Sequence, residues 1–193
     1  LQKVAVYREV LSLAEILPKS MLDAIMLDQD EQVSLEFQQA LSYSDDQVGR
    51  FAQRNILRVR KGISIASVID RLKRKDFISA VFMVDNDRNL LGYVPISALF
   101  NNDENELIDS VARPIQGVED LDYLSDVATN CQFEDGMDYL PVIEDGKLTA
   151  AISISVILHE VQEKFASNSV SEAPVPDEDL FGPVSVAMRG RGL

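Results

Sequence analysis

An internal repeat constrains this chain of 193 residues more than any single motif. Residues 86–94 align with residues 144–152 at an offset of 58, and Val68 aligns with Val127 at an offset of 59. A repeat of this kind fixes the architecture, because each copy is one supersecondary unit that cannot bury its apolar face alone. Two such units are expected to pack their exposed sheet faces against each other.

The apolar pattern within each copy predicts the order strand, helix, strand, strand, helix. Residues 80–84 form a continuous apolar run that is typical of a buried strand, and residues 85–89 are typical of a turn. The alignment of the copies places Met83 on Pro141. The predicted fold class is therefore mixed α/β (α+β). In the first copy we expect strands at residues 56–59, 80–84 and 90–94, and helices after Ser64 and at residues 96–100.

The segments outside the repeat differ from it in character. Residues 1–43 carry apolar side chains at three-to-four spacing, which predicts two or three short amphipathic helices. Short helices bury little apolar surface alone, so we expect these to pack on the repeat or to belong to a longer helical array. Residues 166–179 are rich in Ser, Pro and acidic side chains, which is typical of a linker.

Composition excludes several classes of protein. A formal net charge of −14 and a pI near 4.4 argue against binding to nucleic acid, because basic side chains must neutralise the phosphates. One cysteine, Cys131, excludes a disulfide framework within the chain, and one histidine, His159, excludes a two-histidine metal site. No apolar run reaches the roughly 20 residues of a membrane helix, and the N-terminus lacks a signal-peptide pattern. We therefore expect a soluble, intracellular chain.

Charge is distributed unevenly along the sequence. Residues 50–75 hold nine basic side chains and one acidic side chain, whereas residues 1–49 hold three basic and nine acidic. Residues 76–193 hold six basic and 22 acidic. This pattern fits either segments oriented by electrostatics or an ordinary scatter of solvated charge. The basic run at residues 71–75 fits either contact with anionic lipid headgroups or an exposed helix end.

One stretch of the second copy connects the repeat to a known family. Residues 140–148 read Leu-Pro-Val-Ile-Glu-Asp-Gly-Lys-Leu, which is similar to the LPVVD-x-x-G-x-L stretch of CBS domains. Over residues 50–165 the chain resembles a tandem pair of CBS domains, also called a Bateman module. The resemblance implies one domain at residues 50–107 and a second at 108–165. It also implies a homodimer in which two such pairs stack face to face.

A second resemblance concerns the junction before the repeat. Residues 41–51 read Leu-Ser-Tyr-Ser-Asp-Asp-Gln-Val-Gly-Arg-Phe, which is similar to the junction between the helical N domain and the CBS pair of MgtE-type magnesium transporters. This implies that residues 1–49 are the end of such an N domain and that residues 166–193 are an acidic linker and connecting helix. The chain would then be a cytosolic regulatory region at the cytoplasmic face of the cell membrane, acting on its own transmembrane domain.

The sequence departs from the CBS pattern for nucleotide binding. CBS domains that bind adenosine nucleotides usually carry an Asp that holds the ribose hydroxyls, after the last strand of the unit. The corresponding positions here are Ala98 and Val156, and neither side chain can accept a hydrogen bond. This departure argues against an adenosine nucleotide as ligand. Ser155, Val156 and His159 also stand at or near the places of acidic residues that contribute to magnesium contacts in MgtE proteins.

The MgtE resemblance implies a regulatory magnesium site between acidic surfaces. Mg²⁺ prefers oxygen ligands and retains several waters, so carboxylates that face each other across a domain border could bind it weakly. The bound ion would remove their mutual repulsion and draw the lobes together. Any one of these carboxylates taken alone is more simply a solvated surface group. The candidates are Asp45, Asp46, Glu160, Glu163, Asp177, Glu178 and Asp179.

The leading hypothesis is a magnesium-sensing, gating region of an MgtE-like divalent-cation transporter. We expect no enzymatic activity, because the sequence contains no Gly-rich phosphate loop, nucleophile elbow or paired-histidine motif. The alternative is a stand-alone CBS pair that binds an adenosine nucleotide or a partner protein. A third possibility is a purely structural dimerisation module.

Overall fold

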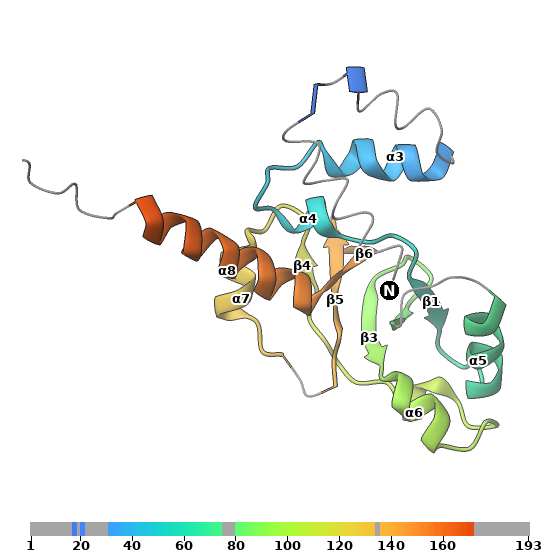
Figure 1. Ribbon diagram of the computed structural model, residues 1–193. Helices are drawn as coiled ribbons and strands as arrows, with labels where there is room; N and C mark the ends of the chain where they lie inside the picture. Colours follow the sequence, from blue (N-terminus) through green and yellow to red (C-terminus); the bar gives the residue numbers. More distant parts are fainter. Residues whose placement is uncertain (1–16, 19, 22–30, 75–79, 134–135, 172–193) are drawn as a thin grey trace, which may run out of the picture.

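The repeat forms two small α+β units that lie side by side, preceded by short helices (Figure 1). Of the helices expected in residues 1–43, the structure contains α3 (Glu31–Ala40), and the other expected helices fall mostly outside the described residues. A short helix that the sequence did not predict, α4 (Val48–Phe51), follows at the junction. The computed structural model describes residues 17–18, 20–21, 31–74, 80–133 and 136–171.

Both copies show the predicted order of strand, helix, strand, strand and helix. The first copy contains β1 (Leu57–Arg60), α5 (Ile65–Arg74), β2 (Val81–Val84), β3 (Leu90–Val94) and α6 (Ile96–Asn101). The 3-10 helix η1 (Ile108–Ser110) follows, and Ile108 is buried in the core of the first unit. The second copy contains β4 (Val118–Glu119), α7 (Leu124–Asn130), β5 (Tyr139–Glu144), β6 (Lys147–Ser153) and α8 (Ile154–Ser171).

Each copy builds a three-stranded sheet with the same topology. The first strand pairs in parallel with the second, and the second pairs antiparallel with the third. The predicted turn at residues 85–89 is confirmed, since the Asp85 carboxylate accepts hydrogen bonds from the backbone N–H groups of Asp87 and Asn89 at 2.9 and 2.8 Å. A side chain that bonds its own backbone two residues on is a common turn device.

The register of the sheets corrects the alignment of the two copies. Met83 corresponds to Val142 and not to Pro141, because the irregularity in the ladder that follows Met83 in the first sheet follows Val142 in the second. The offset is therefore 59 before the hairpin and 58 after it. The turn at residues 85–89 is one residue longer than its counterpart at residues 144–147. Sequence similarity within a turn does not reveal on which side of it a residue has been lost.

The two units exchange their leading segments. Gln53, which precedes β1, pairs with Ala151 of β6 through two backbone hydrogen bonds of 2.8 and 2.9 Å. Arg113, which precedes β4, pairs in the same way with Tyr93 of β3, at 2.8 and 2.9 Å. Each copy thus extends the sheet of the other copy with a piece of its own chain. This reciprocal pairing ties the two units into one body.

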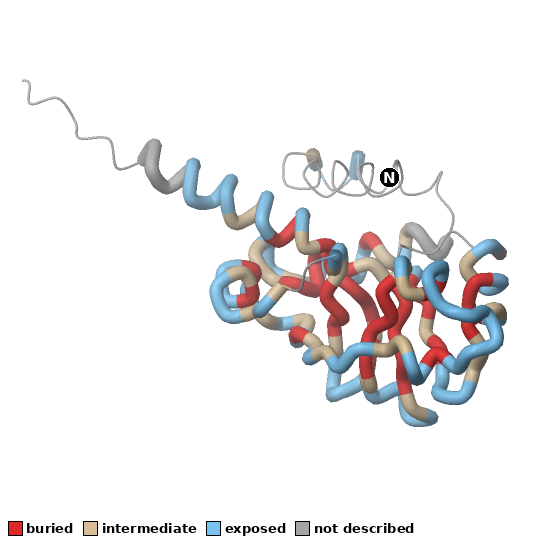
Figure 2. The backbone as a smooth tube through the Cα atoms, turned by 90° about the horizontal axis from the view of Figure 1, so that it is seen from below, coloured by how far each residue is buried: buried red, intermediate tan, exposed pale blue. Residues whose placement is uncertain are grey.

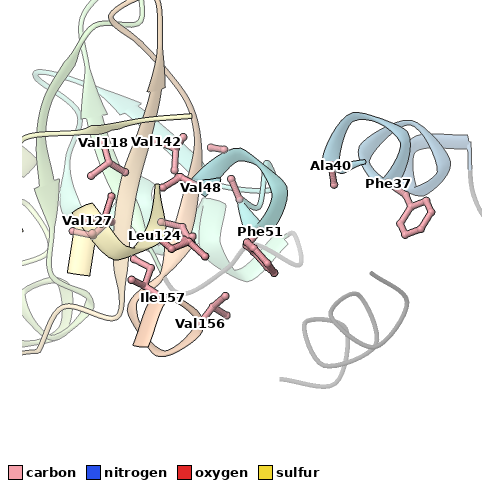
Figure 3. Close-up of a cluster of buried hydrophobic side chains, with 14 residues drawn as sticks. Phe37, Ala40, Val48, Phe51, Val118, Leu124, Val127, Val142, Val156 and Ile157 are labelled. Carbon is pink, nitrogen blue, oxygen red and sulfur yellow. The ribbon is translucent and has the colours of Figure 1, made fainter. Parts of the chain in front are cut away.

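The apolar core has three parts, and the central strands carry most of it (Figure 2). One cluster lies between each sheet and its own helices, and in the second unit it also includes α4, whose side chains lie beside those of α7 and β5 (Figure 3). The third cluster lies between the two sheets. Its buried members are Ile56, Ala80, Phe82, Val84, Tyr93, Leu148 and Ala151.

Helix α8 continues further than the sequence suggested. The linker was expected to begin at residue 166, but α8 runs to Ser171. Ser and Asn cost only a few tenths of a kcal/mol per residue in a helix relative to Ala, and extending an existing helix needs no new nucleus. The packed turns of α8 therefore carry the helix through a polar stretch. Within the described part of the chain, no helix combines the length and the apolar character needed to span a bilayer.

We predict that the cluster between the sheets stabilises both units together. Phe82 is 1% exposed, so Phe82→Ala removes a filled volume between the sheets and should lower the free energy of unfolding by about 3–5 kcal/mol. Urea unfolding followed by circular dichroism measures this. The control is Phe100→Ala, because Phe100 on α6 is 66% exposed and its loss should change stability by less than about 0.5 kcal/mol. If Phe82→Ala unfolded in two steps, with only about half of the circular-dichroism signal lost in the first, one unit would be unfolding without the other. That result would contradict a shared core.

Candidate functional site

The junction at residues 41–51 packs tightly because it contains a glycine in the right place. The ring of Tyr43 lies so close to Gly49 that a Cβ built on this glycine would come within 2.4 Å of the ring. The Tyr43 hydroxyl donates a hydrogen bond of 2.8 Å to Oδ2 of Asp120, just after β4. The Tyr and Gly of the MgtE-like motif therefore form one contact that fastens the junction to the second unit.

Backbone hydrogen bonds reinforce this attachment. The N–H of Gly49 donates to the carbonyl of Asp120 at 2.8 Å, and the N–H of Val48 donates to the carbonyl of Asp122 at 2.9 Å. In the opposite direction, the N–H of Leu124, at the start of α7, donates to the carbonyl of Asp46 at 2.8 Å. The helical region thus enters the fold on the second unit, although the next strand in sequence belongs to the first.

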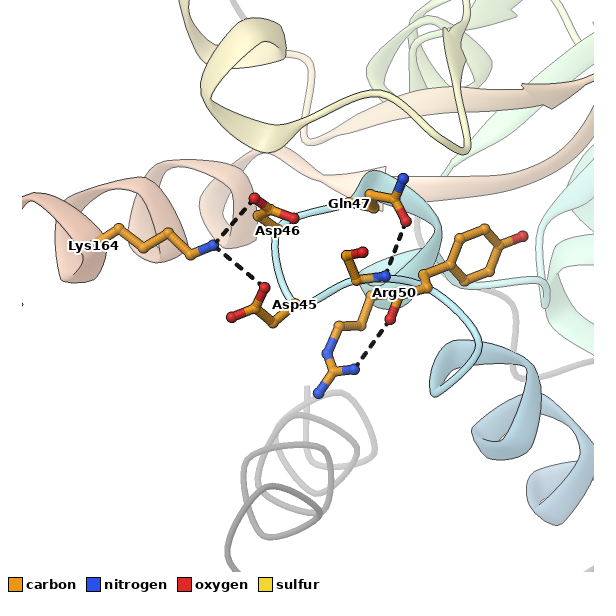
Figure 4. Close-up of polar contacts among 7 residues, drawn as sticks. Asp45, Asp46, Gln47, Arg50 and Lys164 are labelled. Carbon is orange, nitrogen blue, oxygen red and sulfur yellow. Dashed lines mark hydrogen bonds and ion pairs between the residues drawn. The ribbon is translucent and has the colours of Figure 1, made fainter.

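The Arg of the same motif is buried. Arg50 is only 7% exposed, and its Nη1 donates to the carbonyl of Tyr43 at 3.4 Å (Figure 4). The side chain of Gln47 closes the turn, since its Oε1 accepts a hydrogen bond of 2.9 Å from the N–H of Ser44. These contacts hold the intervening residues, Asp45 and Asp46, on the outside of the turn (Figure 4).

A lysine that the sequence analysis did not single out lies against the two aspartates. Nζ of Lys164, on α8, is 3.9 Å from Oδ1 of Asp45 and 3.7 Å from Oδ2 of Asp46 (Figure 4). Lys164 is the one Lys or Arg within α8, which is the signal by which it could have been found. Asp45 and Asp46, predicted to face other acidic groups across a domain border, instead face a cation on α8.

Of the other predicted metal ligands, Glu160 and Glu163 are not gathered with Asp45 and Asp46 into a metal-binding group within the described residues. Oε1 of Glu160 lies 3.7 Å from Nδ1 of His159, and Glu163 is exposed on the same helix. Within the described residues, no three His, Cys, Asp or Glu side chains are grouped so that they could hold a metal ion. The candidates Asp177, Glu178 and Asp179 lie outside the described residues.

The positions that correspond to the ribose-binding Asp of CBS domains are apolar in the structure as in the sequence. Val156 at the start of α8 is 4% exposed and packs in the core of the second unit. Ala98 lies on α6 and is partly buried. Near Val156, the hydroxyl groups of Ser153 and Ser155 bond to each other at 2.8 Å. None of these four side chains supplies a carboxylate.

Comparison with known proteins agrees with this architecture. The family model described as CBS domain matches residues 48–104, and a search of curated proteins finds no significant match. The second unit repeats the topology of the first. The chain has the fold of a CBS-domain pair.

Three solved structures share the fold of this CBS pair. The cystathionine beta-synthase pair domain of a proposed Mg²⁺ transporter from Shewanella oneidensis MR-1 has a TM-score of 0.60 at 21% identity, covering 82% of this chain and 95% of that one. The soluble part of a magnesium transporter has a TM-score of 0.68 at 19% identity, with 80% and 62% covered. The cytosolic domain of the Mg²⁺ channel MgtE, in complex with ATP, has a TM-score of 0.66 at 19% identity, with 77% and 62% covered.

We predict that Gly49→Ala destabilises the CBS pair, although alanine has the higher helix propensity. Propensity alone would favour alanine in α4 by up to about 1 kcal/mol. The new Cβ instead displaces the Tyr43 ring, which can move only by giving up its hydrogen bond to Asp120, so we expect a net loss of about 1–3 kcal/mol in urea unfolding. In a Tyr43→Ala background the substitution should become neutral or stabilising. A loss of equal size in both backgrounds would contradict the proposed contact.

We also predict that Tyr43 makes stability fall at alkaline pH. Burial, followed by the hydrogen bond to Asp120 and the Asp120 charge, raises the pKa of Tyr43 above its ordinary value near 10. The folded state therefore holds the Tyr43 proton more tightly than the unfolded state does. The contribution of protonated Tyr43 to the free energy of unfolding is complete below pH 10 and is lost as pH rises through the folded-state pKa. Tyr43→Phe should flatten the slope of unfolding free energy measured above pH 10, whereas Tyr123→Phe, at a half-exposed ring, should not.

Proposed function

We propose that this CBS pair is the regulatory, non-enzymatic region of an MgtE-like divalent-cation transporter and that its junction responds to Mg²⁺. Two features support the proposal. Tyr43, Gly49 and Arg50 of the MgtE-like motif each make a structural contact at the junction. The fold is also shared with the soluble part of a magnesium transporter and with the cytosolic domain of MgtE. The chain spans 62% of the length of those two structures.

The observation that carries the proposal is the contact of Asp45 and Asp46 with Lys164. It joins the entry of the helical region to α8, the helix by which the chain leaves the second unit. The three side chains are 66%, 38% and 45% exposed, so water and salt screen them. A surface ion pair of this kind contributes about 0–1 kcal/mol. A contact this weak can be shifted by a modest change in cation concentration.

Asp45 and Asp46 have the chemistry that a hydrated Mg²⁺ requires. This ion is commonly held by one or two carboxylates and keeps several waters, so two adjacent aspartates suffice for weak binding. A bound Mg²⁺ would supply a double positive charge to this carboxylate pair. Lys164 is then the competing cation, and its release changes the charge balance at the start of the exposed part of α8. The α8 helix would transmit that change toward the transmembrane domain.

The homodimer and the location at the cytoplasmic face of the membrane belong to the same proposal. A strongly acidic region, with a net charge of −14, accumulates divalent cations from solution and is sensitive to their concentration. Its helical part holds nine acidic and three basic side chains in residues 1–49. Divalent cations therefore reduce the repulsion between this part and the acidic second unit.

The alternative remains a CBS pair that binds an adenosine nucleotide or a partner protein. Its nucleotide version is supported by the ATP complex of the MgtE cytosolic domain, whose fold the chain shares. Ala98 and Val156 weigh against it here, because neither can hold the ribose hydroxyls. Calorimetric titration with adenosine, which has the ribose but no phosphate groups, separates the two proposals: binding would favour the alternative.

We predict that Mg²⁺ binds at the junction in competition with Lys164. In ¹⁵N-resolved NMR spectra of the protein, a MgCl₂ titration should shift the amide signals of residues 44–47 and 160–164, and NaCl at matched ionic strength should not. Lys164→Gln should tighten Mg²⁺ binding by roughly twofold to fivefold, because it removes a competing surface cation. The double variant Asp45→Asn, Asp46→Asn should abolish the shifts at the junction.

The matched control removes the same amount of negative charge elsewhere. Asp87 and Glu104 are exposed and lie outside the junction, so Asp87→Asn with Glu104→Gln should leave the Mg²⁺ response of residues 44–47 intact. Identical shifts in NaCl would reduce the response to charge screening and overturn the proposal. Shifts that persist in the Asp45→Asn, Asp46→Asn variant would place the metal elsewhere and would also overturn it.

A further inference from the structure

A cavity of about 700 Å³ opens on the first CBS unit, away from the junction. It lies where β1 and β2 end, beneath the turn that leads to β3, and one residue of α5 completes its wall. Its volume is in the range of small-molecule sites in proteins. The lining residues are Arg58, Arg60, Lys61, Gly62, Ile63, Arg71, Val84, Asp85, Asn86 and Arg88.

The wall of this cavity is strongly cationic. It contains five basic side chains, Arg58, Arg60, Lys61, Arg71 and Arg88, and a single acidic one. That acidic residue, Asp85, forms hydrogen bonds within the turn at residues 85–89. Its carboxylate accepts hydrogen bonds from the backbone N–H groups of Asp87 and Asn89 and from Nδ2 of Asn89, the last at 2.7 Å. These bonds hold the carboxylate in the turn, and it offsets only one of the five positive charges, which leaves the wall with a formal net charge of four.

The five cations have no carboxylate partner in the part of the chain that the structure describes, where none forms an ion pair within 4 Å. Arg58 is the most constrained. Its guanidinium crosses to the second unit and donates to the carbonyls of Leu148 and Thr149 at 3.3 and 2.5 Å. Burial, followed by repulsion from Arg88, lowers the pKa of Arg58. An anion in the cavity would relieve that repulsion.

The second CBS unit shows that the fold does not require these charges. By the sheet register, Arg58 corresponds to Gly117 and Arg60 to Glu119. The sequence offsets place Asp120, Asn130 and Gly146 at the positions of the other three cations. The two units share a topology, but one carries five positive charges at this place and the other carries two negative charges. The cationic wall is therefore a feature of the first unit alone.

Arg88 illustrates the same point locally. It adopts φ +69°, in the left-handed region that favours glycine, and its counterpart Gly146 adopts φ +75°. A residue with a Cβ at such a position costs about 1 kcal/mol relative to glycine. The first unit thus keeps an arginine where its own repeat uses the less strained residue.

We infer that this cavity binds a phosphate-bearing anion with several negative charges. Arginine forks match phosphate oxygens in pairs, and four of the five cations are arginines. Ile63 and Val84 add an apolar wall that an organic ester can contact. The site is distinct from the ribose position of CBS domains, because Ala98 follows the far end of β3, whereas the cavity lies at the turn before β3. The inference does not rest on the magnesium proposal.

The test uses a free probe and a membrane probe, because a soluble polyphosphate and a phosphoinositide headgroup share this chemistry. Calorimetric titration of the protein with inorganic tripolyphosphate at constant NaCl measures the first. Flotation with phosphatidylcholine vesicles containing phosphatidylinositol 4,5-bisphosphate measures the second. The variants Arg60→Gln and Arg71→Gln each remove one exposed cation of the wall and should each weaken binding of the responding probe by at least about tenfold.

The matched control is Lys147→Gln, which removes one exposed cation outside the lining of the cavity and should leave binding unchanged within about twofold. If tripolyphosphate binds, and Arg60→Gln and Arg71→Gln weaken its binding while Lys147→Gln does not, the ligand is a soluble anion. If only the vesicles bind, with the same dependence on these variants, the ligand is a lipid headgroup. The inference is overturned if neither probe binds. It is also overturned if Arg60→Gln and Arg71→Gln leave binding unchanged, or if Lys147→Gln weakens it equally.

Discussion

The burial of two sheet faces against each other is the constraint on which the rest of the structure depends. Each sheet has only three strands, and a sheet of this size cannot hold a stable fold while one apolar face meets water. Phe82 and Tyr93 of one sheet cover Leu148 and Ala151 of the other. The exchanged pairings of Gln53 and Arg113 then extend each sheet with chain from the other copy. Neither unit can leave without breaking its partner's ladder.

This exchange also decides where the junction at residues 41–51 lies. Because Gln53 pairs with β6, the chain that precedes it must arrive over the second unit, beside α7 and α8. Tyr43 and Gly49 fasten it there through Asp120. The aspartates of the intervening turn therefore meet Lys164 on α8, and not a helix of the first unit. The position of the candidate sensor thus follows from the pairing of Gln53 with Ala151, which involves backbone groups only.

The sequence predicted the elements well, because buried strands such as residues 80–84 are visible as apolar runs and the repeat supplied each one twice. It predicted neither the exchange nor Lys164. A two-residue pairing such as that of Gln53 leaves no periodicity, and an ion pair between residues far apart in sequence is created only by the fold. The cationic cavity was visible only as an excess of basic residues between 50 and 75, because Arg88 joins it through the hairpin.

The distribution of interaction strengths shows which parts of this molecule can respond to a ligand. Contacts such as that of Phe82 contribute several kcal/mol each, so the packing of the two units stays fixed across physiological conditions. The contact of Lys164 with Asp45 and Asp46 contributes about 0–1 kcal/mol, and a ligand can shift an equilibrium only by its difference in affinity for the two states. In the proposed function, a weakly bound divalent cation would act on this contact at the junction and not on the core. The proposed regulation therefore acts through exposed charges at the junction, and not through separation of the two units.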